Sequence, residues 1–239
     1  MTLTVGSLFS GIGGLDLGLE RAGMNVIWQS EIDPYACKVL AKHWPEVPNH
    51  GNIKEIDWST VVQPDVICGG YPCQPFSTAG KRQGEADPRH LWPWVREAIS
   101  QLRPRYAVLE NVRGHLSLGG TTVIGELAAI GYDAEWRVIS AASVGAPHRR
   151  DRVIIVAYPE GEPLQAEHLV FETRWLQTQR GRDTARVGAS FWQAAQPDLV
   201  GVAHGVPARV DRLRALGNAV VPQVAEVIGR LVVSHAQHN

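Results

Sequence analysis

The chain has few cysteines and no long apolar run, and both features limit the classes of protein to which it can belong. The three cysteines, Cys37, Cys68 and Cys73, are an odd number without a Cys-X-X-Cys pair. This argues against a disulfide framework or a zinc site and favours reduced thiols. The histidines show no metal-ligand spacing, so we predict no metal. No stretch has the length of a membrane span or the pattern of a signal peptide, and we therefore expect a cytoplasmic protein without a membrane partner.

An excess of charge of one sign is also missing. The formal net charge is −1, which gives no sign of a nucleic-acid partner. The last of the four lysines is Lys81, and between Arg174 and Arg214 there are seven arginines against three acids. Arginine suits phosphates and guanine edges, but a solvated arginine-rich face explains the same pattern. Charge alone leaves the partner open.

Short apolar runs alternate with helical patterns over the first two thirds of the chain, which is typical of a parallel α/β sheet. We predict strands at residues 3–9, 26–31, 65–70, 106–111 and 152–157. Helices are predicted after residue 14, over 91–102 and from Pro222 onward. The fold class is therefore α/β, with a doubly wound, mostly parallel sheet in residues 1–158 and 209–239. Periodicity fades over residues 159–208, where we expect a small irregular insert.

A glycine-rich turn at residues 9–14 follows the first predicted strand. Glycines let the backbone approach a ligand at the mouth of a sheet, although a tight turn without a ligand has the same composition. The next strand ends in Glu31, 17 residues after Gly14. A carboxylate at that point can accept both hydroxyls of a ribose. The two features predict a nucleoside-containing cofactor, and they do not distinguish NAD from S-adenosylmethionine.

Chemically capable side chains follow the later predicted strands. Cys73 stands among prolines and glycines at a strand end, so we predict that it is functional. Cys37 and Cys68 fit the small buried hydrophobe that lone cysteines most often are. Glu110 ends an apolar strand, where partial removal from water would raise the pKa of its carboxyl; a capping or ion-paired acid is the alternative. The arginines at 149, 150 and 152 place fixed positive charge near the last predicted strand of the sheet, although a surface arginine cluster explains the same pattern.

In order, the segments SLFSGIGGLDLGLERAG, SEID, GGYPCQPFS, LENV, PHRRDR and GNAVVP resemble the motif series of the DNA (cytosine-5)-methyltransferase family. The resemblance covers residues 5–157 and 209–233. It implies a Rossmann-like fold, S-adenosylmethionine as cofactor and methylation of C5 of a cytosine flipped out of double-stranded DNA. It further implies that Cys73 attacks C6, that Glu110 acts at N3, that Arg152 contacts O2, and that Arg150 supports the pocket.

The resemblance also implies a cofactor pocket, together with several departures from the family pattern. Its residues are Phe9, Ser10, Gly11, Ile12 and Gly13 around the cofactor, Glu31 at the ribose, Ile32, Asn52 and Ile53 at the adenine, Pro72, Leu91 near the methionine part, and Asn218 and Val220 closing the pocket. Ser7 stands where many members have an acid, and Asn52 where an aspartate is common. We expect both departures to alter cofactor affinity rather than chemistry. Ile32 replaces a frequent tryptophan, and His148 the usual glutamine.

The predicted insert is much shorter than the usual target-recognition segment of the family. Short members of this kind resemble bacteriophage and prophage enzymes. We therefore predict a recognition site of about two to four base pairs, with candidate contacts at Arg174, Arg180, Arg182, Arg186 and Gln193. The loop at 74–90 is the predicted lid, with Gly80 and Gly84 as hinges. We expect a monomer without an obligate protein partner.

Two other functions stay open. The tRNA-acting branch of the same family shares the pocket but typically carries a Cys-Phe-Thr tripeptide, which this sequence lacks. A binding module that keeps the fold without catalysis is the second, although it has no physical need to keep Cys73, Glu110 and Arg152 together. RNA cytosine methyltransferases that use two cysteines fit poorly, because Glu110 occupies the strand-end position.

Overall fold

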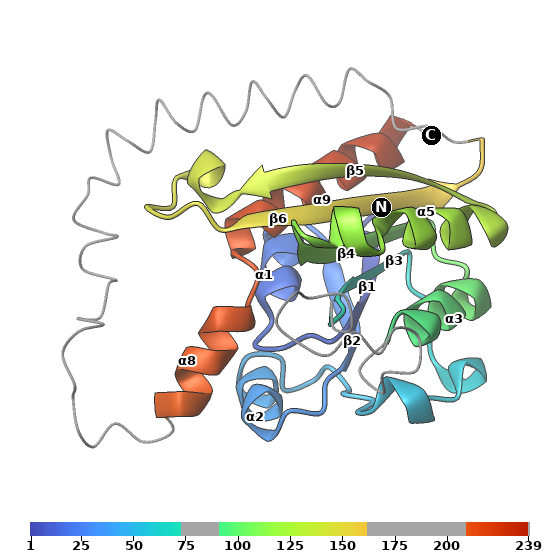
Figure 1. Cartoon of the computed structure of the whole chain (residues 1–239). Coiled ribbons are helices and arrows are strands. Elements are labelled where there is room, and N and C mark those ends of the chain that lie inside the picture. The colour runs from blue at the N-terminus through green and yellow to red at the C-terminus, as the bar shows by residue number, and fades with distance from the viewer. Residues whose placement is uncertain (73–90, 162–208, 239) are drawn as a thin grey trace.

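The computed structural model describes residues 1–72, 91–161 and 209–238 and contains a six-stranded sheet with the strand order β2-β1-β3-β4-β6-β5 (Figure 1). The strands are β1 (Thr4–Leu8), β2 (Asn25–Ser30), β3 (Val66–Gly70), β4 (Tyr106–Val112), β5 (Tyr132–Ser140) and β6 (Asp151–Pro159). Neighbours from β2 to β4 are parallel, whereas β6 runs antiparallel to both β4 and β5. The predicted α/β class with a mostly parallel sheet is confirmed.

Helices cover both faces of this sheet (Figure 1). They are α1 (Gly14–Arg21), α2 (Pro34–His43), α3 (Trp92–Leu102), α4 (His115–Leu118), α5 (Gly120–Ala129), α8 (Arg209–Asn218) and α9 (Pro222–His238), with short 3-10 turns η1 (Ile53–Glu55), η2 (Trp58–Thr60) and η4 (Ala141–Val144). One hydrophobic cluster joins α1 and α9 to the sheet, and a second joins α3 and α5 to it. Two separate cores on opposite faces make the sheet doubly wound.

Helix α9 packs directly on α1 through small residues. A Cβ atom on Gly18 would lie 2.4 Å from the Cβ of Ala225, and one on Gly14 would lie 2.5 Å from the carbonyl oxygen of Val220. Within the described residues, Ala215–His238 is the one helical stretch long and apolar enough to cross a membrane by length and composition. Most of its buried residues belong to the hydrophobic cluster that joins α1 and α9 to the sheet, and this packing accounts for its hydropathy. The contact holds the segment before α9 at the N-terminus of α1.

The predicted strands and helices are present with shifts of one or two residues at their ends, whereas β5, α2, α4, α5 and α8 were not predicted. Cys68 is fully buried, as expected. The prediction for Cys37 is wrong: its side chain is half-buried, and its Sγ lies 3.3 Å from the carbonyl oxygen of Glu31, to which it donates. Most of the predicted insert, from residue 162 to 208, lies outside the described residues.

Candidate functional site

The predicted site residues converge on one edge of the sheet. Strands β1 to β4 are parallel, so their carboxyl ends share that edge, and the antiparallel strand β6 begins there. The turn after β1, Glu31 after β2, Pro72 after β3 and Glu110 near the end of β4 all lie at this edge. Ligands of α/β proteins bind outside the carboxyl ends of the strands. The topology therefore gathers the cofactor candidates and the catalytic candidates into one region.

The turn after β1 is sharply bent. Gly11 and Gly13 have φ values of 55° and 81°, which glycine adopts without steric cost, and Phe9 has a φ of 52°, which is strained for a residue with a side chain. The amide of Ser10 donates to the carbonyl of Ser30 (3.3 Å), and the amide of Gly13 donates to the carbonyl of Ser10 (2.9 Å). Helix α1 begins directly afterwards, so the positive end of its dipole faces the same edge.

The carboxylate of Glu31 is fixed by backbone donors. Its Oε2 accepts from the amide of Gly11 (2.7 Å), and its Oε1 accepts from the amides of Ile32 and Asp33 (2.8 Å each). A carboxylate offers about four acceptor positions, so Oε2 keeps capacity for a ligand hydroxyl. The side chain of Ile32 is 67% exposed beside it. A polar acceptor next to an exposed apolar side chain suits a ribose joined to a base.

The other cofactor candidates lie around this centre at different depths. Val220 is buried with its carbonyl against Gly14, so the structure does bring the C-terminal motif to the turn. Ile53 is buried in the core, and Asn52 caps η1, accepting from the amide of Lys54 (3.2 Å). Ser10 is buried, Ile12 and Leu91 are half-buried, and Pro72 and Asn218 are exposed.

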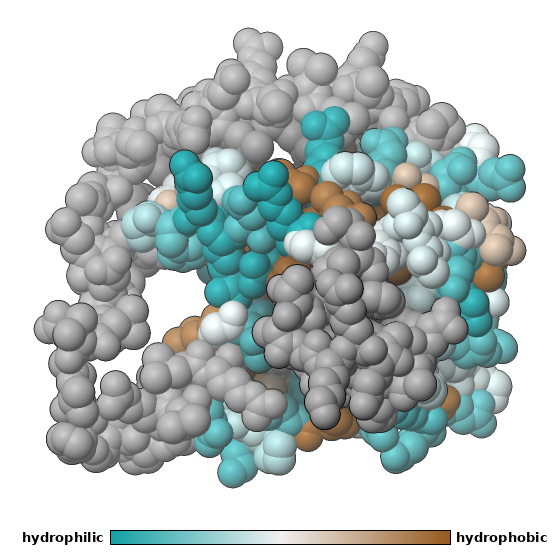
Figure 2. Space-filling model, viewed as in Figure 1, coloured by the Kyte–Doolittle hydropathy of each residue, from teal (hydrophilic) through white to brown (hydrophobic). Residues whose placement is uncertain are grey.

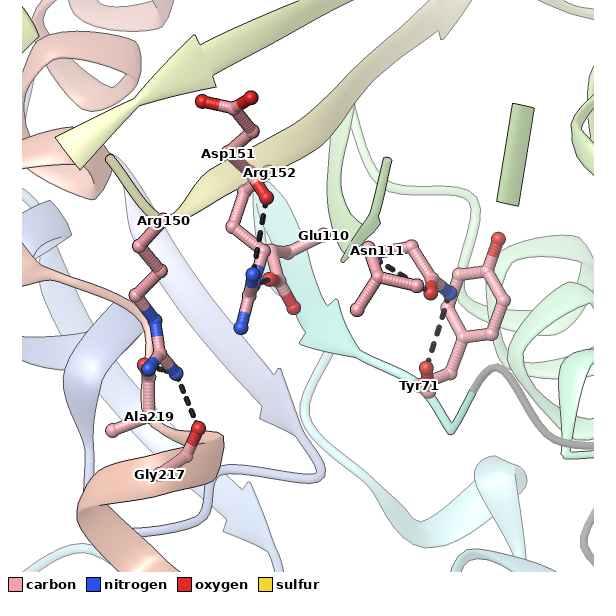
Figure 3. A network of polar contacts seen from close by, with 9 residues as sticks. Tyr71, Glu110, Asn111, Arg150, Asp151, Arg152, Gly217 and Ala219 are labelled. Atoms are coloured by element: carbon pink, nitrogen blue, oxygen red, sulfur yellow. Dashed lines mark hydrogen bonds and ion pairs between the residues drawn. The ribbon is translucent and has the colours of Figure 1, made fainter. Parts of the chain in front are cut away.

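Glu110 forms a nearly buried ion pair with Arg152 (Figure 3). Nε of Arg152 lies 2.6 Å from Oε1 of Glu110, and the two side chains are only 18% and 10% exposed. Burial raises the pKa of the Glu110 carboxyl more than the charges of Arg152 and Arg150 lower it, in the direction that the sequence predicted. A Cβ at Gly70 would lie 2.8 Å from Oε2 of Glu110, so a glycine there leaves room for the carboxylate.

Arg150 ties the start of β6 to the C-terminal motif (Figure 3). Its Nη2 donates to the carbonyl oxygens of Gly217 and Ala219, both at 2.6 Å. Its φ of 37° is in the left-handed region, and its buried Nε makes no hydrogen bond within the described residues. Burial, followed by the charge of Arg152, lowers the pKa of Arg150, which still leaves an arginine protonated. Its contacts connect the start of β6 to the segment that precedes α9.

The residues that precede Cys73 are anchored to β4 and α4. The hydroxyl of Tyr71 lies 2.8 Å from Nε2 of His115, and Nδ2 of Asn111 donates to the carbonyl of Tyr71 (3.1 Å; Figure 3). The ring of Tyr71 also packs on Trp92 at a centroid distance of 5.4 Å. Burial lowers the pKa of His115, which favours its neutral form. Cys73 itself and the predicted lid at 74–90 lie outside the described residues.

Sequence reasoning did not assign a role to Tyr71, Asn111 or His115. Asn111 lies inside a recognised motif and Tyr71 lies two residues before Cys73, so their position in the sequence was a signal. His115 carries no such signal, because its contact with Tyr71 joins residues 44 positions apart.

Residues 3–195 match the sequence model of a family described as C-5 cytosine-specific DNA methylase. The chain is 37% identical over 161 residues to the type II methyltransferase M.BsuFI of Bacillus subtilis, covering 65% of this chain and 39% of that protein. It is 32% identical over 212 residues to the type II methyltransferase M.AplI of Arthrospira platensis, covering 83% and 59%. The chain thus spans between about two fifths and three fifths of the length of these relatives.

A solved structure shares the fold. It is that of a candidate DNA modification methyltransferase encoded within a prophage of E. coli, with a TM-score of 0.58 and 28% sequence identity. The likeness covers 69% of this chain and 49% of that one.

Proposed function

The chain belongs to the C-5 cytosine-specific DNA methylase family, and from that premise we propose that it transfers a methyl group from S-adenosylmethionine to C5 of cytosine in double-stranded DNA. The observation that carries the proposal is the Glu110–Arg152 pair, which lies at the same strand edge as the glycine turn and Glu31. An acid whose pKa burial raises, held next to a fixed cation, suits a heterocycle that must gain a proton. The site of the protein thus supports what the family suggests.

The donor set fits S-adenosylmethionine. Glu31 offers Oε2 to a ribose hydroxyl, the exposed side chain of Ile32 offers an apolar surface to adenine, and the bent turn after β1 brings backbone close to the ligand. Asn52, Pro72, Leu91, Asn218 and Val220 complete the proposed pocket. When bound, the cofactor supplies an electrophilic methyl group on a sulfonium. The protein supplies its orientation.

The catalytic residues would act on the cytosine ring. The thiolate of Cys73 adds to C6 while Glu110 gives its proton to N3, and the ring gains nucleophilic character at C5. Because the pKa of Glu110 is raised, its carboxyl holds a proton at a higher pH than a carboxyl in water does. Arg152 contacts O2, and its planar guanidinium can bind Glu110 and a ligand oxygen together. After methylation, loss of the C5 proton to a base, departure of Cys73 as a thiolate and return of the N3 proton to Glu110 restore the ring.

The substrate surface would include the turn between β5 and β6. Figure 2 shows hydrophilic residues gathered over this turn, where His148 and Arg149 are exposed. The cytosine must leave the stack to reach Glu110, at a cost of a few kcal/mol. Residues 159–208 are the proposed recognition segment for a short site. The cytoplasm, where bacterial or infecting phage DNA is present, is the proposed compartment.

Methyl transfer from labelled S-adenosylmethionine to unmethylated duplex DNA tests the proposal. We expect label in 5-methylcytosine, and conversion sequencing then reads the recognition site. The Cys73→Ser variant should bind the cofactor and transfer no methyl group. Label on tRNA but not on duplex DNA would assign the protein to the RNA-acting branch, and cofactor binding without transfer to either would leave a binding module.

A further inference from the structure

A chain of buried hydrogen bonds runs beneath the cofactor turn. The hydroxyl of Ser10 lies 2.9 Å from that of Ser7, which donates to Oδ2 of Asp16 at 3.0 Å. Oδ1 of Asp16 accepts from Nε2 of Gln29 at 2.8 Å. All four side chains are buried, with Asp16 at 0% exposure. We call these residues, Ser10, Ser7, Asp16 and Gln29, the buried relay.

An aspartate at this buried position lowers the stability of the fold when it is ionised. Within the described residues no lysine, arginine or histidine forms an ion pair with it. Burial raises the pKa of its carboxyl to about 6, against the opposing effect of the bonds from Gln29 and Ser7. A raised pKa means that the ionised form destabilises the fold: the contribution to stability is full below pH 3.8 and is lost as the pH rises through about 6. A neutral side chain would avoid this cost, so packing alone does not explain an aspartate.

The relay ends on the residue that sets the shape of the turn. Ser10 accepts from Gly13 through its carbonyl and donates to Ser30 through its amide, so its position determines where residues 10–13 lie. Glu31 holds the same turn from the other side through the amide of Gly11. The turn is therefore clamped between two carboxylates, one at its ligand side and one in the core below it.

We infer that Asp16 is a positioning residue for the cofactor turn: its carboxylate orients the Ser7 hydroxyl, which fixes Ser10 and so sets the turn for the nucleoside ligand. The inference rests on the proposed function, because it concerns the affinity for S-adenosylmethionine. The ionised carboxylate accepts on both oxygens, from Ser7 and from Gln29. Once the Asp16 carboxyl is protonated, one of its oxygens becomes a donor that faces the donor of Ser7 or Gln29. The hydrogen bonds of the buried relay can then no longer all form.

Cofactor affinity consequently depends on pH. Within the described residues, the other titratable groups that interact electrostatically with Asp16 are Glu20 on α1 and Cys68 on β3. Burial raises the pKa of the Cys68 thiol far above neutrality, so this group stays uncharged. Between pH 8 and pH 5, protonation of Asp16 is the change that the relay senses, and the affinity falls with it.

The test measures the dissociation constant of S-adenosylmethionine by calorimetry between pH 5 and pH 8. In the wild-type protein we expect binding to weaken as the pH falls through about 6. Asp16→Asn should bind roughly tenfold more weakly at pH 8, equivalent to about 1.4 kcal/mol, and should lose most of the pH dependence. Ser7→Ala keeps the titrating group but disconnects it from Ser10, so it should lose the pH dependence too. Glu97→Gln, an exposed acid on α3, is the matched control and should behave as wild type.

Thermal unfolding separates positioning from a structural role. Asp16→Asn should be at least as stable as wild type at pH 8, because it removes a buried charge, and yet bind more weakly. If the wild-type protein binds and both variants keep its affinity and its pH dependence, the inference is overturned while the proposed function stands. If the wild-type protein does not bind S-adenosylmethionine at any pH, the proposed function fails first.

Discussion

For a single residue such as Glu110, function follows from the balance between burial and nearby positive charge. Burial raises the pKa of the carboxyl and so favours its protonated form, whereas Arg152 at 2.6 Å lowers the pKa and favours loss of the proton. The result is an acid whose pKa lies above its ordinary value, with a fixed orientation. Neither neighbour alone gives this result: burial without the arginine leaves the carboxyl unoriented, and the arginine without burial leaves a plain carboxylate.

Replacing Glu110 by glutamine tests this balance. The amide keeps the shape but cannot deliver a proton, so we expect the methyl-transfer rate to fall by roughly 10²–10⁴-fold. Binding of S-adenosylmethionine should be unchanged, because Glu31 and the turn are intact. Single-turnover kinetics and calorimetry measure the two effects separately. Turnover by Glu110→Gln at the wild-type rate would show that Glu110 takes no part in the chemistry.

Between secondary-structure elements, two buried tyrosine–histidine pairs anchor opposite ends of β4. Tyr71 contacts His115 at 2.8 Å near the site, and Tyr106 contacts His235 at 2.7 Å at the other end of the strand. The chemistry is the same in both pairs. Only the first lies next to the segment that leads to Cys73.

This pairing supplies a matched experiment. Tyr71→Phe and Tyr106→Phe each remove one buried hydroxyl, and each should lower the free energy of unfolding by about 1–3 kcal/mol. Tyr71→Phe should also lower the methyl-transfer rate, by roughly tenfold, without changing the cofactor dissociation constant. Equal rates for the two variants would show that the Tyr71–His115 contact stabilises the fold and does not position the residues that precede Cys73.

Apolar runs predicted β1, β3, β4 and β6 because these strands are buried, whereas the edge strand β5 carries Asp133, Glu135 and Arg137 and has no such run. The ends of parallel strands predicted which edge would hold Glu31 and Glu110. Contacts between distant residues were not predictable: Asp16 looks like an ordinary first-turn acid in the sequence, and only the folded chain buries it.

For the whole molecule, the tight contact between α1 and α9 joins the beginning of the fold to its end. Gly18→Ala should separate the two helices, because the new Cβ would lie 2.4 Å from the Cβ of Ala225 and from the carbonyl of Pro222. We expect a loss of about 1–3 kcal/mol in unfolding free energy and weaker cofactor binding, since Val220 would move away from Gly14.

The matched control is Gly125→Ala on α5, where a Cβ would meet nothing within 4 Å. That change should stabilise the protein by about 0.4–1 kcal/mol, as helical glycine-to-alanine changes do in open space. Urea unfolding measures both variants. If Gly18→Ala is as stable as Gly125→Ala, then separating α1 from α9 does not lower the free energy of unfolding.

The α1–α9 contact also has a consequence for synthesis on the ribosome. The glycine turn emerges early and Val220, which closes against Gly14, emerges late. At about 5–20 residues per second, the turn waits on the order of 10–40 s before its cover exists. Throughout that time the proposed nucleoside pocket is incomplete and one face of α1 is uncovered. Translation that stops before Val220 would therefore give a chain that has Glu31 and Glu110 but lacks the segment that covers the proposed pocket. That face of α1 would then be exposed to chaperones.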